Sequence, residues 1–195
     1  MSKFLKEFGK DGIYHQIVKL KNPGASVEEI SRGLATNNPM VARAAAIHPN
    51  ATKEHLDKAI NCNISNVRAA AAKNQNATKE HLDIALNDDN YMVREAAAGN
   101  PNATKEHLNR ALSDKDSNVR ETAARHPNAT KEHLDKALSD ENWAVRVSAA
   151  KNPNATKEHL DLALNDPEIY VRIEAARNPN CTEEQLILYH LKYND

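Results

Sequence analysis

The residues most able to do chemistry in this chain are histidines that directly follow a glutamate. The pair recurs at Glu54-His55, Glu80-His81, Glu106-His107, Glu132-His133 and Glu158-His159. Imidazole and carboxylate groups are common ligands of zinc and iron in proteins. A regular row of such pairs therefore raises the possibility of a metal centre or of a metal-dependent enzyme.

The spacing of the pairs argues against a shared metal ion. They recur every 26 residues, and a fixed period between 20 and 50 residues is typical of stacked tandem repeats. Neighbouring helical layers lie about 8–10 Å apart, whereas the ligands of one metal must converge to about 2.1 Å from it. We therefore predict no metal site and no cofactor.

A structural role explains the histidines better. Each one occupies the third helical position after a threonine, where Ser26-Val27-Glu28-Glu29 and Thr182-Glu183-Glu184-Gln185 place the last residue of an S/T-x-x-E/Q capping box. In such a box the side chain at this position reaches back to the start of the helix. We expect the histidines to serve helix capping or to face solvent.

The pairs belong to a longer repeat, N-P-N-A-T-K-E-H-L. It begins at His48, Asn74, Asn100, His126 and Asn152, with weaker copies at Asn22 and Asn178. Proline and asparagine favour a turn, and the following threonine can cap a helix. In the unit that starts at His126, Leu134, Ala137 and Leu138 form one apolar stripe, and Val145, Ala149 and Ala150 form a second. Each unit is thus predicted to fold as two short helices.

The predicted fold is an all-α, right-handed α-solenoid, a superhelix of tandem 26-residue two-helix repeats with a cap at each end. Residues 1–21 form the N-terminal helical cap, residues 22–177 the six repeats and residues 178–195 the C-terminal capping helix. The N-terminal cap residues include Phe4, Leu5 and Phe8. Stacked repeats bury their apolar faces against their neighbours, so the core is continuous along the stack.

Charge and cysteine content narrow the possible functions. The formal net charge is -1, whereas proteins that bind nucleic acid through phosphates usually carry a basic domain or stripe. No membrane-spanning or signal-type segment is evident. Cys62 and Cys181 are too far apart in a stack to form a disulfide. We expect a cytoplasmic protein whose N-x-T asparagines form loops rather than carry glycans.

A further pattern carries a family resemblance. The run L-x-x-A-L-S-D-x-x-x-x-V-R-x-x-A-A-x-x-P, from Leu134 to Pro153, resembles the leucine-rich repeat variant family and its HEAT-like relatives. An aspartate stands six residues before an arginine at Asp88/Arg94, Asp114/Arg120, Asp140/Arg146 and Asp166/Arg172. The resemblance implies a ladder in which each aspartate meets arginines of the same or the next repeat. Cys62 replaces the aspartate and Ala42 the arginine, so the ladder is expected to fail at the N-terminal end.

The resemblance also supplies two alternatives. HEAT-like arrays include DNA glycosylases, which makes a nucleic-acid-binding module possible, although the near-zero net charge disfavours it. Arrays similar to deoxyhypusine hydroxylase hold iron through repeated His-Glu pairs, in the reverse order to the pairs found here. The chain contains no G-x-S-x-G, Walker, Rossmann or H-E-x-x-H pattern. We therefore predict no catalytic residues and no enzymatic activity.

The positions that differ among the repeats carry the functional prediction. They gather at the start of the second helix, where Ser65, Tyr91, Ser117, Trp143 and Ile169 are equivalent. The resemblance implies that second helices line a concave face, and exposed aromatic residues are typical binding anchors. We predict a non-enzymatic scaffold that binds a protein or an extended peptide segment, not a membrane, through Tyr91, Trp143, Tyr170, Arg94, Arg120 and Arg146. The alternative that the aromatic rings only pack between repeats stays open.

Overall fold

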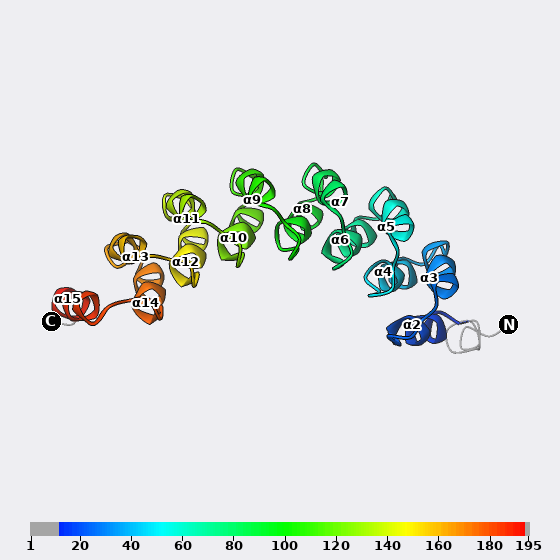
Figure 1. The fold of residues 1–195 in the computed structure, drawn as a ribbon, viewed down its shortest axis with the longest axis horizontal. Helices are drawn as coiled ribbons and strands as arrows, with labels where there is room; N and C mark the ends of the chain where they lie inside the picture. Colours follow the sequence, from blue (N-terminus) through cyan, green and yellow to red (C-terminus); the bar gives the residue numbers. More distant parts are fainter. Residues whose placement is uncertain (1–11, 194–195) are drawn as a thin grey trace. The chain divides into compact units, whose positions relative to one another are not determined.

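The chain forms two compact helical units. The computed structural model describes residues 12–193, which contain fourteen α-helices and no β-strand (Figure 1). The units are Met1–Asn102 and Ala103–Asp195, and each is described by itself. Phe4, Leu5 and Phe8 of the expected N-terminal cap lie outside the described residues.

The helices of both units are short. Unit 1 contains α2 (Ile13–Lys21), α3 (Val27–Leu34), α4 (Pro39–Ala46), α5 (Lys53–Ile60), α6 (Ser65–Lys73), α7 (Lys79–Ala85) and α8 (Tyr91–Ala98). Unit 2 contains α9 (Lys105–Ala111), α10 (Ser117–Arg125), α11 (Lys131–Leu138), α12 (Trp143–Lys151), α13 (Lys157–Ala163), α14 (Ile169–Arg177) and α15 (Glu183–Tyr193).

Within each unit the helices pack in two rows. In unit 1, α4, α6 and α8 pack side by side in one row, and α3, α5 and α7 in the other. In unit 2, α10, α12 and α14 form one row and α11 and α13 pack together in the second (Figure 1). The two helices of a repeat also contact each other. The predicted all-α stack of two-helix repeats is therefore confirmed, whereas the hand of the superhelix stays a prediction.

A narrow apolar core holds these short helices together. Each first helix of the regular repeats buries one leucine completely, and each second helix buries one valine and one or more alanines. Isolated helices of this length are unstable in water, so packing must supply their stability. Small side chains allow close approach: a Cβ on Gly33 of α3 would lie 2.8 Å from Leu20 Cδ1 and 2.9 Å from Ala45 Cβ.

Candidate functional site

The five histidines of the Glu-His pairs cap the first helices. Their Nδ1 atoms accept the backbone N–H of the preceding threonine at 2.9–3.1 Å, in His55, His81, His107, His133 and His159. A backbone N–H can only donate, so Nδ1 must be unprotonated and the neutral ring carries its proton on Nε2. All five residues are buried. The expected capping role is confirmed, and the alternative that they face solvent is wrong.

The other ring nitrogen links neighbouring repeats. His81 Nε2 donates to Asp57 Oδ1 at 2.9 Å, and His159 Nε2 donates to Asp135 Oδ1 at 3.0 Å. In the first of these repeats Ser31 replaces the aspartate, and its hydroxyl lies 2.7 Å from His55 Nε2. Both nitrogens of these rings are therefore engaged and offer no lone pair to a metal. Among residues 12–193, no three His, Cys, Asp or Glu side chains gather as a metal site would require.

A second ladder consists of buried asparagines. The first asparagine of the N-P-N motif donates both amide hydrogens to the preceding repeat: Asn74 Nδ2 lies 2.8 Å from the Ala46 carbonyl and 2.9 Å from the His48 carbonyl. Asn100, Asn152 and Asn178 repeat this arrangement. Histidine can take the same place, since His48 Nε2 donates to the Asn22 carbonyl at 2.9 Å. Sequence reasoning missed this ladder; its only signal was a side-chain amide or imidazole at a fixed position of every repeat.

Removing one amide of this ladder should weaken unit 1. Asn74→Ala leaves two carbonyls without their donor in a buried site, which costs about 1–3 kcal/mol for each unsatisfied group. Urea unfolding should show a loss of stability of about this size, and Asn74→His should retain part of the stability because His48 makes one of the two bonds at the equivalent position. Asn66→Ala, on the exposed surface of α6, is the control and should change stability by less than about 0.5 kcal/mol. Equal effects at the two positions would contradict the ladder.

A third ladder joins arginines to aspartates. Arg146 donates from Nε to Asp166 Oδ2 at 2.7 Å and from Nη2 to Oδ1 at 2.9 Å, while Nη1 donates to the Asp140 carbonyl at 2.9 Å. The same rung joins Arg120 to Asp140 and Arg68 to Asp88. Each arginine thus binds the carboxylate 20 residues later in the chain and only the backbone of the aspartate in its own repeat. The expected ladder is confirmed.

The rungs also shift the pKa of their carboxyl groups. Burial raises the pKa of Asp88, Asp140 and Asp166, but hydrogen bonds from the paired arginine and from a backbone N–H outweigh burial. The net result is a pKa below the ordinary value. These carboxylates therefore stay ionised and paired at neutral and mildly acidic pH.

One rung is missing at the N-terminal end, as expected. Ala42 and Cys62 stand where the arginine and the aspartate of a single rung belong. The two departures from the repeat therefore remove the same rung. A cavity of about 290 Å³ lies there, lined in part by Thr36, Asn37, Ala42 and Cys62. The Cys62 thiol donates to the Ile64 carbonyl at 3.5 Å, and both cysteines are free thiols.

The structure separates the predicted partner-binding residues into two kinds. Arg94 and Arg120 are buried, and the guanidinium of Arg146 is fully used by its rung. The aromatic side chains are exposed: 41% for Tyr91 in unit 1, and 46% for Trp143 and 58% for Tyr170 in unit 2.

Unit 2 brings two of these aromatic rings together. Trp143 begins α12 and Tyr170 is the second residue of α14; their ring centroids lie 5.4 Å apart at an interplanar angle of 33°. Ile169 beside them is 50% exposed. We call Trp143, Ile169 and Tyr170 the aromatic patch. Glu168 stands at the N-cap of α14 and makes no capping bond, whereas Asn142 caps α12 through its side chain.

The basic residues at the C-terminal ends of the second helices of unit 2 are paired with acids. Arg125, Lys151 and Arg177 lie at the C-terminal ends of second helices, where the helix dipole favours cations. Arg125 pairs with Glu121 at 3.5 Å, and Lys151 and Arg177 pair with Glu174 at 3.7 and 3.2 Å. Neighbouring acids thus offset each cation. This pairing weakens the attraction that these three cations could offer to a phosphate backbone.

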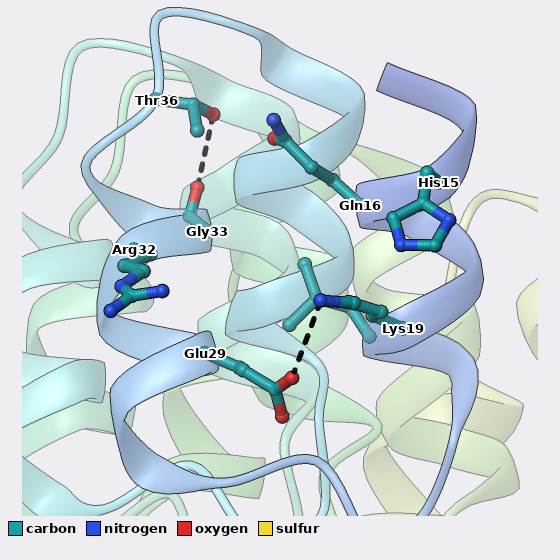
Figure 2. A pocket seen from close by; sticks show the side chains of 8 residues that line it. His15, Gln16, Lys19, Glu29, Arg32, Gly33 and Thr36 are labelled. Atoms are coloured by element: carbon teal, nitrogen blue, oxygen red, sulfur yellow. Dashed lines mark hydrogen bonds and ion pairs between the residues drawn. The ribbon is translucent and has the colours of Figure 1, made fainter. Parts of the chain in front are cut away.

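A further candidate is a small cavity between α2 and α3 of unit 1 (Figure 2). It has a volume of about 170 Å³ and its lining includes His15, Lys19, Glu29 and Arg32. The Glu29 carboxylate is already used, because it accepts the Ser26 backbone N–H at 2.9 Å and lies 3.9 Å from Lys19 Nζ. Among the described residues, the lining therefore offers no further carboxylate for general acid–base work.

No family model matches the sequence, and a search of curated proteins found no match. Among solved structures, the chain is similar to "a leucine-rich repeat variant with a novel repetitive protein structural motif", with a TM-score of 0.64 and 22% sequence identity over 90% of this chain and 74% of that chain. No helix in residues 12–193 is long and apolar enough to cross a membrane. A likeness at this identity concerns the fold alone. In fold, the chain is similar to a leucine-rich repeat variant, as its motifs indicated.

Proposed function

We propose that the chain is a non-enzymatic scaffold that binds another protein through the N-terminal ends of its second helices. In unit 2 the contact is the aromatic patch, and in unit 1 it includes Tyr91 and its exposed neighbour Met92. Such repeat folds present many equivalent positions along one row of helices. A few variable side chains can therefore set the specificity without disturbing the stack.

The observation that carries this proposal is the pair of exposed rings in unit 2. Other repeats place serine and asparagine at the same two positions, as in Ser65-Asn66 and Ser117-Asn118. The fold therefore does not need aromatic residues there. Rigid aromatic side chains at a wet surface contribute much of the energy at protein interfaces, because they bury a large area at little cost in entropy.

Two of the predicted arginines support the helices that present this surface. Arg120 and Arg146 hold consecutive second helices together through Asp140 and Asp166. Their hydrogen-bonding groups are engaged, so a partner would gain little by contacting them directly. In this proposal their replacement weakens binding only by loosening the helices that present the aromatic patch.

Replacing the patch with residues from other repeats should abolish binding and preserve the fold. Trp143→Ser with Tyr170→Asn introduces the side chains of Ser117 and Asn118, and partner affinity should fall at least tenfold, since one such anchor contributes about 2 kcal/mol or more. Quantitative affinity capture from the native cell compares this variant with the wild type.

The matched control is Leu162→Lys. Leu162 is 64% exposed on the first-helix row, and Lys136 occupies the equivalent position in the preceding repeat. Proteins that the control retains and the patch variant loses are the partners. If both variants retained every captured protein, the proposed surface would be wrong. Nucleic acid captured by both variants would favour the alternative function, a nucleic-acid-binding module.

A further inference from the structure

Each complete arginine–aspartate rung uses the guanidinium in two ways. One edge is anchored to the arginine's own repeat: Arg146 Nη1 donates to the carbonyls of Asp140 and Glu141 at 2.9 and 3.2 Å. The other edge, Nε and Nη2, receives the carboxylate of the next repeat. Anchoring by the first edge fixes the direction in which the second edge points.

Arg172 of α14 has the anchor but not the carboxylate. Its Nη1 donates to the carbonyls of Asp166 and Pro167 at 2.8 and 2.9 Å, as in the complete rungs. The residue 20 positions later, where the aspartate belongs, is Lys192. Within residues 12–193 the Nε atom of Arg172 is buried and has no hydrogen-bond partner. An orphaned donor of this kind is costly and calls for an acceptor.

An aromatic ring and one further cation lie beside this unfilled edge. The Tyr193 ring lies 4.4 Å from Arg172 Cζ, and Lys192 Nζ lies 5.1 Å from the centroid of the same ring. Lys192 donates to Asn165 Oδ1 at 2.6 Å. Two neighbouring acids do not fill the edge: Glu174 pairs with Lys151 and Arg177, and Glu168 is exposed at the N-cap.

The face of α14 that would meet a further repeat is also uncovered. Ala176 is partly exposed, whereas Ala124 and Ala150 at the equivalent positions of α10 and α12 are buried. A second copy stacked in repeat register would not supply the missing acid. The position of the rung aspartate holds Thr36 in its first repeat and Cys62 in its second.

We propose that Arg172 is the centre of a carboxylate-binding site that takes an aspartate or glutamate side chain of a partner protein. The carboxylate occupies the place of the missing aspartate and accepts bidentate hydrogen bonds from Nε and Nη2 of Arg172. Lys192 adds a second positive charge beside it. This site is distinct from the aromatic patch and does not depend on the function proposed for that patch.

Acetate is a suitable probe of the site, with chloride at the same ionic strength as the reference. The Nε–Hε resonance of Arg172, followed by ¹H–¹⁵N NMR, should shift saturably with acetate, whereas that of Arg146 should not move because its edge is already occupied. Lys192→Asp should supply the carboxylate internally, abolish the response of Arg172 to acetate and raise the melting temperature. A linear, unsaturable shift, or an undiminished response in Lys192→Asp, would overturn the proposal.

A tail variant distinguishes an external carboxylate from the chain's own terminal acids. It combines Asp195→Asn with a neutral glycine–serine extension, which carries the terminal carboxylate away on a flexible segment. This variant should respond to acetate as the wild type does if the ligand comes from a partner. If only this variant responded, the chain's own terminus would be the occupant and the partner site would be refuted. Melting temperatures in acetate and in chloride are compared as well. Arg172→Gln, which lacks the guanidinium group, gives the baseline for that comparison.

Discussion

Replacing the capping histidines His55 and His133 by glutamine should make the stability of this protein less dependent on pH between about 7 and 5. Each histidine accepts a backbone N–H at Nδ1, so a protonated ring cannot keep that bond. Glutamine can keep it without titrating. The chain already contains the example: Gln185 Oε1 accepts the Thr182 backbone N–H at 2.9 Å, and its Nε2 donates to Asp161 Oδ1 at 2.6 Å.

The sign of the effect follows from the direction of the pKa shifts. Burial lowers the pKa of His55 and His133 below the ordinary value near 6.5. As the pH falls below about 6.5, the unfolded chain takes up protons before the folded chain does. Stability is therefore complete above the unfolded pKa and is lost as the pH falls toward the folded pKa, by at most about 1.4 kcal/mol per pH unit for each of these two histidines.

The charged groups around the rings set the size of each contribution. His55 faces the Ser31 hydroxyl, with Glu54 and Lys58 nearby. His133 lies near Glu132, Lys105 and Lys136.

Urea unfolding at pH 7, 6 and 5 measures the prediction. The wild type should lose stability over this range, while the variant with glutamine at positions 55 and 133 should lose less. The rung carboxylates titrate at lower pH, because their pKa values are lowered. A glutamine variant as acid-sensitive as the wild type would show that other groups dominate the response.

Restoring the missing rung should give a strongly non-additive result. Ala42→Arg alone places a guanidinium in the cavity beside Ala42 and Cys62 without a carboxylate, and Cys62→Asp alone places a carboxylate there without a cation; each should destabilise unit 1. Together they recreate the bidentate geometry of Arg68 and Asp88. We expect a coupling free energy of about 1–3 kcal/mol in a double-mutant cycle.

Denaturant unfolding of the wild type, both single variants and the double variant measures this coupling. The matched comparison is the removal of an existing rung, Arg146→Ala with Asp166→Ala, whose cycle should give a coupling of the same sign. Strict additivity at residues 42 and 62 would show that the cavity cannot hold a rung and that the two departures from the repeat are unrelated.

The period predicted the helices well because capping and burial act within one repeat. Thr130 caps α11, Val145 and Ala149 of α12 are buried, and helix α12 ends before Asn152, as the pattern indicated. The position of the histidines at the third helical residue likewise predicted their capping role. These features depend on neighbours a few residues away, which the sequence shows directly.

Contacts between repeats were harder to predict. The Asn74 amide binds backbone carbonyls of the preceding repeat, and every residue has a carbonyl, so no side-chain pattern marks the partner. The arginine ladder was visible, but its carboxylate partner lies in the next repeat rather than in the same one. Arg120 and Arg146 were expected to contact a partner as well, whereas the rungs engage their guanidinium groups.

The most direct test of the proposed function is a measurement on Trp143, the only tryptophan in the chain. Incorporation of 5-fluorotryptophan gives one ¹⁹F resonance from the aromatic patch, whatever tryptophans an unlabelled partner contains. Addition of a partner identified by affinity capture should shift this resonance saturably, and Tyr170→Asn should weaken the titration. A captured partner that binds with full affinity and leaves the Trp143 resonance unchanged would contradict the account.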